Sequence, residues 1–395
     1  MHVKNKETTI SSRVRSLAPS PTLGLDTEVK NLRAEGIPVI NLGLGEPDFS
    51  TPAHIVRAGV AALAQGFTHY TETPGIPELR EEIAKKLRRD NKISYLPSEV
   101  VAGVGSKQIL YHAFQALCER GDHVVIPTPT WTTYVEQVKL AGALPVYCKL
   151  TSPFKLTALA LAKRFSPRTR VLLLNSPANP TGATIDQEEL RRIAELAVRT
   201  RIFVISDEIY EKILYQGKHR SIASFGPRIR ERTLTVNGFS KAYAMTGWRI
   251  GYAAGPERLI RAITSLQSQT TSNTSSIAQK AAIEALRGSQ APLARMRQEF
   301  TLRREFLVRS LSRIDSISFV PPEGAFYLFV NVQRLLNHRM PTASAWCAKL
   351  LKEKRVAIVP GESFLAPGFV RISFAASMHD LKRGARRIAD FSRGR

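Results

Sequence analysis

Residues 171–210 read VLLLNSPANPTGATIDQEELRRIAELAVRTRIFVISDEIY, and this stretch decides the fold. Two short apolar runs, at 171–175 and 203–206, lie on either side of a segment at 187–199 whose apolar residues have helical spacing. Short apolar strands separated by helices are typical of a mostly parallel sheet that is covered by helices on both faces. We therefore predict an α/β fold built around this strand–helix–strand unit.

The same alternation continues on both sides of this unit. Further strands are expected at 100–104, 123–126, 144–147, 234–237 and 250–254. Beyond residue 256, long helical patterns and short strands predict a second, smaller α+β unit, with strands at 318–320, 326–330, 356–359 and 370–374. We predict a large domain over residues 46–290. Residues 1–45, which include an N-terminal arm, and 291–395 are expected to form a small domain.

Three other segments carry more local expectations. Residues 52–64 predict a helix with Thr51 as its N-cap, and residues 77–89 predict a charged amphipathic helix. Residues 265–276 are rich in Ser, Thr and Gln, and we expect an ordered loop or helix surface there.

The composition excludes several classes of protein. The chain has 395 residues, 43% of them hydrophobic, so it is neither disordered nor fibrous. Its three cysteines lie far apart without a C-x-x-C pair, which argues against a zinc or disulfide framework. No secretory signal or apolar run of about 20 residues occurs, so a cytoplasmic protein without a membrane partner is expected.

The net charge of +24 raises the alternative of a nucleic-acid binder. Basic pairs such as Lys382-Arg383 and Lys85-Lys86 have helical spacing, and such faces are usually solvated. They lack interleaved aromatic residues and any nucleic-acid motif. We therefore expect no nucleic-acid partner, and the charge is expected to draw anionic substrates toward the site.

Polar residues follow several of the expected strands, where ligands of such sheets bind. Asn179, Asp207 and Lys241 come after three strands, and residues 105–107 open a helix after a fourth. Arg371 follows Val370 in the last expected strand. Each has a plain structural interpretation by itself: a turn, a helix cap, a solvated cation. Their joint occurrence at successive strand ends favours a single binding site.

Pyridoxal phosphate (PLP) is the cofactor that accounts for this set. Lys241 would bond to its aldehyde, which requires a lysine pKa below the usual range. Asp207 would keep the ring nitrogen protonated, so that the ring can accept electrons. Asn179 and Tyr210 would bind the phenolic oxygen. The predicted catalytic residues are Lys241, Asp207 and Tyr210.

The phosphate of this cofactor needs an anion site. Gly105, Ser106 and Lys107 open a helix, and helix N-termini bind anions through free N–H groups and the helix dipole. Arg249 would add a charge-assisted contact. Rival motifs fail: the third glycine of a dinucleotide fingerprint, the spacing of a Walker A loop, a histidine pair for a metal and a Gly-x-Ser-x-Gly elbow are all missing. No metal site is expected.

With these motifs in place, the chain resembles the class I/II aminotransferases of PLP fold type I, and within them the bacterial aspartate aminotransferases. The motifs that carry the resemblance are GLGEPDF (43–49), TPGIPELR (73–80), NPTG (179–182), SDEIYE (206–211), KAYAMTGWR (241–249) and RIS (371–373). The resemblance implies a large domain with a seven-stranded sheet, and a homodimer whose subunits share their active sites.

The resemblance also implies roles for single residues. Tyr70 would reach the phosphate of the neighbouring subunit's cofactor, and Trp131 would stack on the cofactor ring. Arg371, helped by Asn179 and the backbone of Gly45, would bind the substrate α-carboxylate, as a bidentate arginine can.

The chain also departs from the family pattern at one phosphate contact. Gly238 stands where many members carry a phosphate-binding serine, and Ser240 is expected to replace it in part.

In the subgroup that the chain resembles, a lysine and a Ser/Thr bind the distal carboxylate of an acidic substrate. Lys107 and Thr22 occupy those positions, with Ser20 and Thr22 as a closing lid. The expected function is ping-pong transamination between aspartate, or another acidic amino acid, and a 2-oxo acid such as 2-oxoglutarate. The alternatives are an aminotransferase for aromatic or other amino acids and a PLP-dependent lyase or cyclase.

Overall fold

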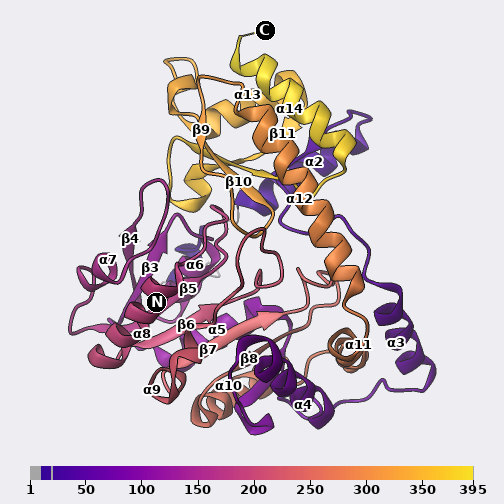
Figure 1. Cartoon of the computed structure of the whole chain (residues 1–395), viewed down its shortest axis with the longest axis vertical. Helices are drawn as coiled ribbons and strands as arrows, with labels where there is room; N and C mark the ends of the chain where they lie inside the picture. The colour runs from indigo at the N-terminus through magenta and orange to yellow at the C-terminus, as the bar shows by residue number, and fades with distance from the viewer. Residues whose placement is uncertain (1–9, 19–20, 395) are drawn as a thin grey trace, which may run out of the picture.

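A seven-stranded sheet forms the core of the larger part of the computed structural model, which describes residues 10–18 and 21–394 (Figure 1). Its strands are β2 (Val100–Gly103), β3 (His123–Thr128), β4 (Leu144–Lys149), β5 (Thr169–Asn175), β6 (Phe203–Asp207), β7 (Thr233–Gly238) and β8 (Gly251–Ala254). Their order is β2-β8-β7-β6-β5-β3-β4, and only β8 runs antiparallel to its neighbours. The predicted mostly parallel sheet is confirmed.

Alternating residues of each strand pack against opposite layers of helices, because successive side chains of a strand point to opposite faces. On β5, Val171 and Leu173 join one buried cluster and Leu172 and Leu174 join another. The first cluster holds α5 (Gly105–Leu117), α6 (Thr133–Leu140) and α10 (Glu257–Thr270). The second holds α7 (Ala158–Ala162), α8 (Gln187–Thr200) and α9 (Pro227–Arg230). The sheet is therefore buried on both faces, which explains its continuous apolar strands.

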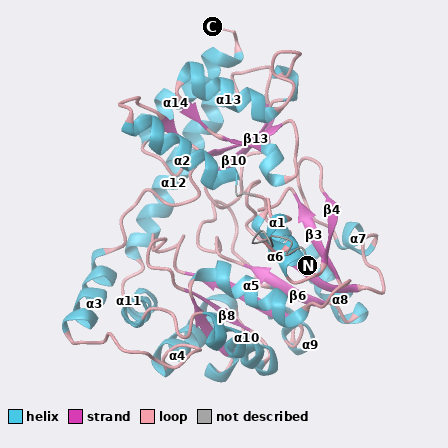
Figure 2. Ribbon diagram, turned by 180° about the vertical axis from the view of Figure 1, so that it is seen from behind, coloured by secondary structure: helices cyan, strands magenta, loops and turns pink. Residues whose placement is uncertain are grey.

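Near β2 and β8, a third cluster covers the sheet on the face opposite α5. It is formed by α3 (Ala53–Ala64), α4 (Pro77–Lys86) and α11 (Ser276–Arg287). Figure 2 shows α3, α4 and α11 gathered at this side of the molecule.

A four-stranded antiparallel sheet lies at the other end of the molecule (Figure 1). It consists of β9 (Ser318–Phe319), β10 (Tyr327–Asn331), β12 (Val359–Pro360) and β13 (Phe369–Ser373) in the order β12-β13-β10-β9. Beside it, β1 (Ile40–Asn41) pairs in parallel with β11 (Val356–Ala357). The associated helices are α2 (Pro21–Ala34), α12 (Ala291–Leu311), α13 (Ala343–Lys354) and α14 (Met378–Ser392). The smaller α+β unit is confirmed, and the chain boundaries proposed for the two domains stay a prediction.

The long helix α12 extends from this smaller unit toward the large sheet (Figure 1). The remaining short elements are α1 (Ser12–Arg15), a π-helical turn (Leu87–Asn91) and single 3₁₀ turns at Pro97–Glu99, Ile222–Phe225, Gln333–Leu335 and Gly361–Phe364. Across the part of the chain that the structure describes, no helix has the length and apolar character needed to cross a membrane.

Two local expectations need correction, and a third is confirmed. Thr51 does not cap α3, whose N-cap is Pro52; its hydroxyl instead donates to the carbonyl of Ala244 and accepts from the indole of Trp248. The helix expected at 77–89 ends at Lys86 and continues as the π-helical turn. Residues 265–276 form the end of α10, a short loop and the start of α11, so the expected ordered loop or helix surface is confirmed.

Candidate active site

A cavity of about 420 Å³ opens where the strands of the large sheet end and the small unit approaches them. Parallel strands place their carboxyl ends at one edge, so motifs far apart in sequence meet there. Eleven of the residues expected from the sequence line this cavity: Gly45, Ser106, Lys107, Trp131, Asn179, Asp207, Tyr210, Ser240, Lys241, Arg249 and Arg371.

Lys241 follows β7 and brings its amine into the cavity. Its Nζ donates a hydrogen bond to the carbonyl oxygen of Gly45. Burial lowers the pKa of Lys241 to about 8, with further lowering by the cations Arg371 and Arg249, while Glu46 acts in the opposite direction. A fraction of the amine is therefore neutral near pH 7, as the sequence analysis required.

Asp207 is the last residue of β6, and its carboxylate is buried below the cavity. One oxygen accepts a hydrogen bond from the hydroxyl of Tyr134 at 2.7 Å, and the other accepts from the backbone N–H of Ile209 at 3.1 Å. Burial raises the pKa of Asp207 to about 6, although these two hydrogen bonds favour the ionised form. The plain interpretation as a helix N-cap is wrong, because a turn and not a helix follows Asp207.

The start of α5 forms a positively charged end of the cavity. Gly105 has φ +76°, and a Cβ atom there would lie 2.7 Å from Nη2 of Arg249. Glycine therefore lets the Arg249 guanidinium approach the first turn of α5, where backbone N–H groups have no partner within the helix. The Lys107 ammonium lies 4.8 Å from the centre of the Trp131 ring, and burial and the charge of Arg249 lower its pKa.

Arg371, on β13, is the buried cation at the small-unit side of the cavity. Its Nη1 donates to Oδ1 of Asn179 at 2.9 Å, and its Nη2 donates to the carbonyl of Gly43 at 2.7 Å. The guanidinium also lies over the ring of Tyr327, 4.3 Å from its centre. Asn179 is thus beside Arg371 as expected, but the backbone contact comes from Gly43, and Gly45 contacts Lys241.

Three residues that the sequence analysis missed belong to this site. The hydroxyl of Tyr327 lies 2.8 Å from that of Tyr210, Tyr134 binds Asp207, and Glu46 accepts a hydrogen bond from Thr246 at 2.8 Å. Tyr327 lies within the apolar run 326–330, which indicated a core strand, and Tyr134 lies three residues after Trp131. Their buried hydroxyls, which need partners, were the available signal.

The other expected residues lie outside the cavity lining. Gly105 is at the base of α5 and makes room for Arg249. Tyr70 is 89% exposed and does not line the cavity of its own chain. The side chain of Thr22 and the whole of Ser20 lie outside the described residues.

The donor set fits pyridoxal phosphate in a specific orientation. Asp207 is a carboxylate whose pKa is raised by burial, and a protonated ring nitrogen would provide the counter-charge that favours its ionised form. The cationic start of α5 with Arg249 matches a phosphate. Lys241, with a lowered pKa, lines the same cavity as both groups and matches the aldehyde.

Comparisons with known proteins agree with this site. The family model described as aminotransferase class I and II matches residues 37–388. The aspartate aminotransferase of Geobacillus stearothermophilus is 46% identical over 390 residues, which are 98% of this chain and 99% of that one. A probable aspartate/prephenate aminotransferase of Aquifex aeolicus is 44% identical over 394 residues, covering 96% of this chain and 97% of that one.

A solved structure gives the same answer for the fold. The crystal structure of the aspartate aminotransferase of Rhizobium meliloti superimposes with a TM-score of 0.93 at 42% identity, covering 98% of this chain and 99% of that one. The architecture is therefore fold type I, as the resemblance implied. Because the match extends over nearly the whole chain, this protein is a member of the class I and II aminotransferase family and an enzyme that transfers amino groups.

Proposed function

We propose that this enzyme is a PLP-dependent aspartate aminotransferase that transfers the amino group of aspartate, or of another acidic amino acid, to a 2-oxo acid such as 2-oxoglutarate. The relatives named above carry that activity in their names. The observation that carries the proposal is the placement of Lys241, Asp207 and Arg371 around one cavity, since these supply the three groups that such a reaction needs.

Pyridoxal phosphate, when bound, supplies an electron-accepting ring that stabilises negative charge at the substrate Cα. Lys241 would bind its aldehyde and Asp207 its ring nitrogen. Tyr210 and Asn179 would donate hydrogen bonds to its phenolic oxygen, and Trp131 would stack on its ring. The phosphate contacts would come from Gly105, Ser106, Lys107, Ser240 and Arg249.

The proton transfer is assigned to Lys241. Once released by the incoming amino acid, its amine can take a proton from the substrate Cα and return it elsewhere as an acid. A pKa of about 8 suits both steps, because the neutral and charged forms are both populated near neutral pH. Arg371 would hold the substrate α-carboxylate, with Asn179, Gly43 and Tyr327 fixing its guanidinium.

Substrate selection is assigned to Lys107. Its ammonium lines the cavity at the side of Trp131 and has no carboxylate partner among the described residues, so it is available for the distal carboxylate of an acidic substrate. Thr22 would assist. The name of the Aquifex relative includes prephenate, which makes prephenate a second amino acceptor to test.

The active enzyme is proposed to be a cytoplasmic homodimer with shared active sites. Tyr70 would reach the phosphate of the partner's cofactor. Its 89% exposure leaves the ring accessible to a partner subunit.

The test is an absorbance spectrum of the purified enzyme, followed by borohydride reduction and peptide mapping. We expect a band between about 360 and 430 nm, a range typical of this cofactor, that disappears on adding aspartate and returns with 2-oxoglutarate. The reduced cofactor should map to Lys241, and Lys241→Ala should bind cofactor without turning over. Steady-state transamination by Lys241→Ala, or mapping to another lysine, would refute the assignment. A product assay for pyruvate and ammonia distinguishes a lyase.

A further inference from the structure

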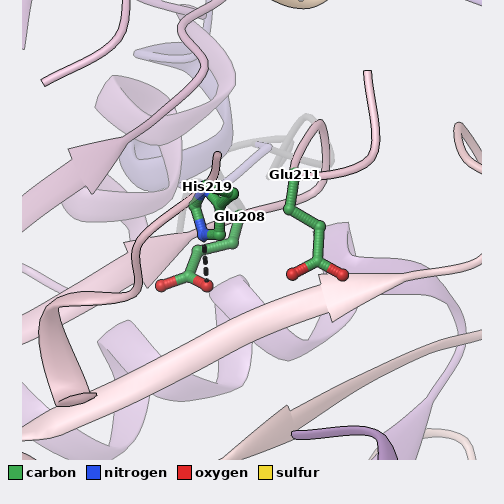
Figure 3. Close-up of side chains that lie close together, drawn as sticks. All are labelled: Glu208, Glu211 and His219. Carbon is green, nitrogen blue, oxygen red and sulfur yellow. Dashed lines mark hydrogen bonds and ion pairs between the residues drawn. The ribbon is translucent and has the colours of Figure 1, made fainter. Parts of the chain in front are cut away.

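Behind the end of β6, on the side away from the cavity, lies a buried cluster of charged residues that the proposed mechanism does not use. Figure 3 shows Glu208, Glu211 and His219 side by side, with His219 joined to Glu208. Lys86, from α4, and Asn91, from the π-helical turn, complete the group. None of the five lines the active-site cavity.

Both oxygens of the Glu208 carboxylate accept hydrogen bonds. One oxygen accepts hydrogen bonds from Ser206 at 3.0 Å and Ser221 at 2.7 Å. The other accepts from Nε2 of His219 at 2.8 Å and from Nδ2 of Asn91 at 3.3 Å. Glu208 is 1% exposed, so an ionised carboxylate here depends on these partners.

The cluster is not a metal site, although its ligand atoms lie close enough to hold an ion. The ammonium of Lys86 already contacts Glu211 and donates to Asn91 at 2.8 Å. Burial lowers the pKa of His219, but the carboxylate of Glu208 outweighs this effect, so the net pKa is raised. The raised pKa favours the imidazolium form of His219. Two carboxylates then face two cations, and an additional divalent ion would leave the interior with excess positive charge.

The position of Glu208 is coupled to that of the active-site residues by the backbone. Asp207 and Tyr210 of the same turn face the cavity, while Glu208 and Glu211 face the cluster. The turn is short and closed: the N–H of Glu208 donates to Val236 at 2.8 Å, and the N–H of Glu211 donates to Glu208 at 2.9 Å. A shift of Glu208 must therefore displace the side chains on the other side of the turn.

We propose that His219, through its ion pair with Glu208, is a positioning residue that holds the 207–210 turn so that Asp207 and Tyr210 face the cofactor. This inference rests on the proposed function, because the cofactor contacts of Asp207 and Tyr210 belong to that proposal. His219 does not itself reach the cavity.

The ion pair also has an electrostatic consequence for the site. The groups that face His219 are Glu208, Glu211 and Lys86. The charge of Glu208 is close enough to Asp207 to raise the pKa of that carboxyl. Removing the imidazolium leaves the negative charge of Glu208 without its positive partner. That charge then raises the pKa values of the ionisable groups nearby, Asp207 among them. Removing the charges of both His219 and Glu208 leaves the net charge of the cluster unchanged.

The test compares three full-length holoenzymes: wild type, His219→Gln and the charge-balanced double variant His219→Gln/Glu208→Gln. For His219→Gln we expect cofactor binding to weaken roughly tenfold, the size of coupling seen between residues in one network. The pH midpoint of the cofactor absorbance band should move to higher pH, and kcat should fall while KM for aspartate changes less than about threefold. The double variant should recover most of the shift in the band midpoint, because it leaves no uncompensated charge at Glu208.

His123→Gln is the matched control, since His123 is a half-buried histidine with one hydrogen bond, to Ser166 at 3.0 Å, at the opposite end of the sheet. If His219→Gln matches wild type and His123→Gln in cofactor affinity and band midpoint, the proposal is wrong. It is also wrong if the band midpoint of the double variant stays as far from wild type as that of the single variant.

If His219→Gln does not fold, Ser221→Ala removes only a neutral donor from Glu208. A severalfold loss of cofactor affinity then supports positioning through Glu208, and unchanged affinity contradicts it. A wild-type protein without the cofactor band would instead refute the proposed function, so the two failures are distinguishable.

Discussion

The hydroxyl of Tyr134 donates a 2.7 Å hydrogen bond to the buried carboxylate of Asp207. Tyr134 is in the first turn of α6, and its ring packs edge-on against Trp131, with ring centres 5.2 Å apart. The bond therefore connects the end of β6 to the segment that carries the aromatic wall of the cavity. The other oxygen of Asp207 is held separately, by the backbone N–H of Ile209 at 3.1 Å.

Tyr134→Phe is expected to weaken cofactor binding about tenfold. The hydrogen bond favours ionised Asp207, so its loss raises the pKa of that carboxyl further above about 6 and reduces the charge available to the cofactor ring nitrogen. A hydrogen bond to a charged group contributes roughly 1.5–3 kcal/mol. Titration of cofactor-free protein with PLP, followed by fluorescence, measures the change. Affinity equal to wild type would show that the bond has no part in holding the cofactor.

Lys107→Ala is expected to reduce kcat/KM for aspartate about ten- to a hundredfold relative to an aromatic amino acid. The reason is the lost charge-assisted contact with the distal carboxylate, worth roughly 1.5–3 kcal/mol. Relative rates for aspartate and phenylalanine in wild type and variant give the answer. The absorbance band of the bound cofactor serves as the control. If Lys107 only binds the phosphate, the variant should lose cofactor, and kcat/KM should fall equally for both substrates.

Arg371→Lys is expected to raise KM for both the amino donor and the 2-oxo acid by at least about tenfold, with the cofactor band unchanged. Lysine keeps the positive charge but lacks the planar guanidinium of arginine. In the wild type this group donates to Asn179 and Gly43 and would also bind the substrate carboxylate. Steady-state kinetics with each substrate varied in turn measure the effect. An increase confined to one substrate would contradict a shared carboxylate site, since a ping-pong enzyme binds both at one place.

The stability of the cofactor-free protein is expected to fall as pH rises from about 4 to about 6, through the contribution of Asp207. Its pKa is about 6 in the folded protein and 3.8 in the reference chain, so the folded state binds more protons in this window. The contribution is complete below pH 4 and lost above pH 6, and its size is at most roughly 3 kcal/mol. Urea unfolding of wild type and Asp207→Asn across this range isolates it. A difference between the two proteins that stays constant with pH would contradict the raised pKa.

The sequence was sufficient for the framework of this enzyme because local patterns control it. Alternating strands and helices follow from the period of apolar residues, and Lys241, Asp207 and Asn179 were found because parallel strands end at one edge. The expected fall in the pKa of Lys241 was also correct in direction. Thr51 shows the limit of local reasoning: a good N-cap residue was used instead to bind Trp248 and Ala244, which are almost 200 positions away.

What the sequence by itself determined is the α/β architecture, the smaller unit and the set of polar strand ends that meet in one cavity. Only the tertiary structure decided which partners orient those groups: Tyr134 for Asp207, Tyr327 for Tyr210, and Gly43, 328 positions away, for Arg371. Apolar periodicity reports which face of an element is buried, because burial depends on the summed area of many residues. It does not report which buried hydroxyl or carbonyl lies within 3 Å of a given charge, since that distance depends on how separate elements pack.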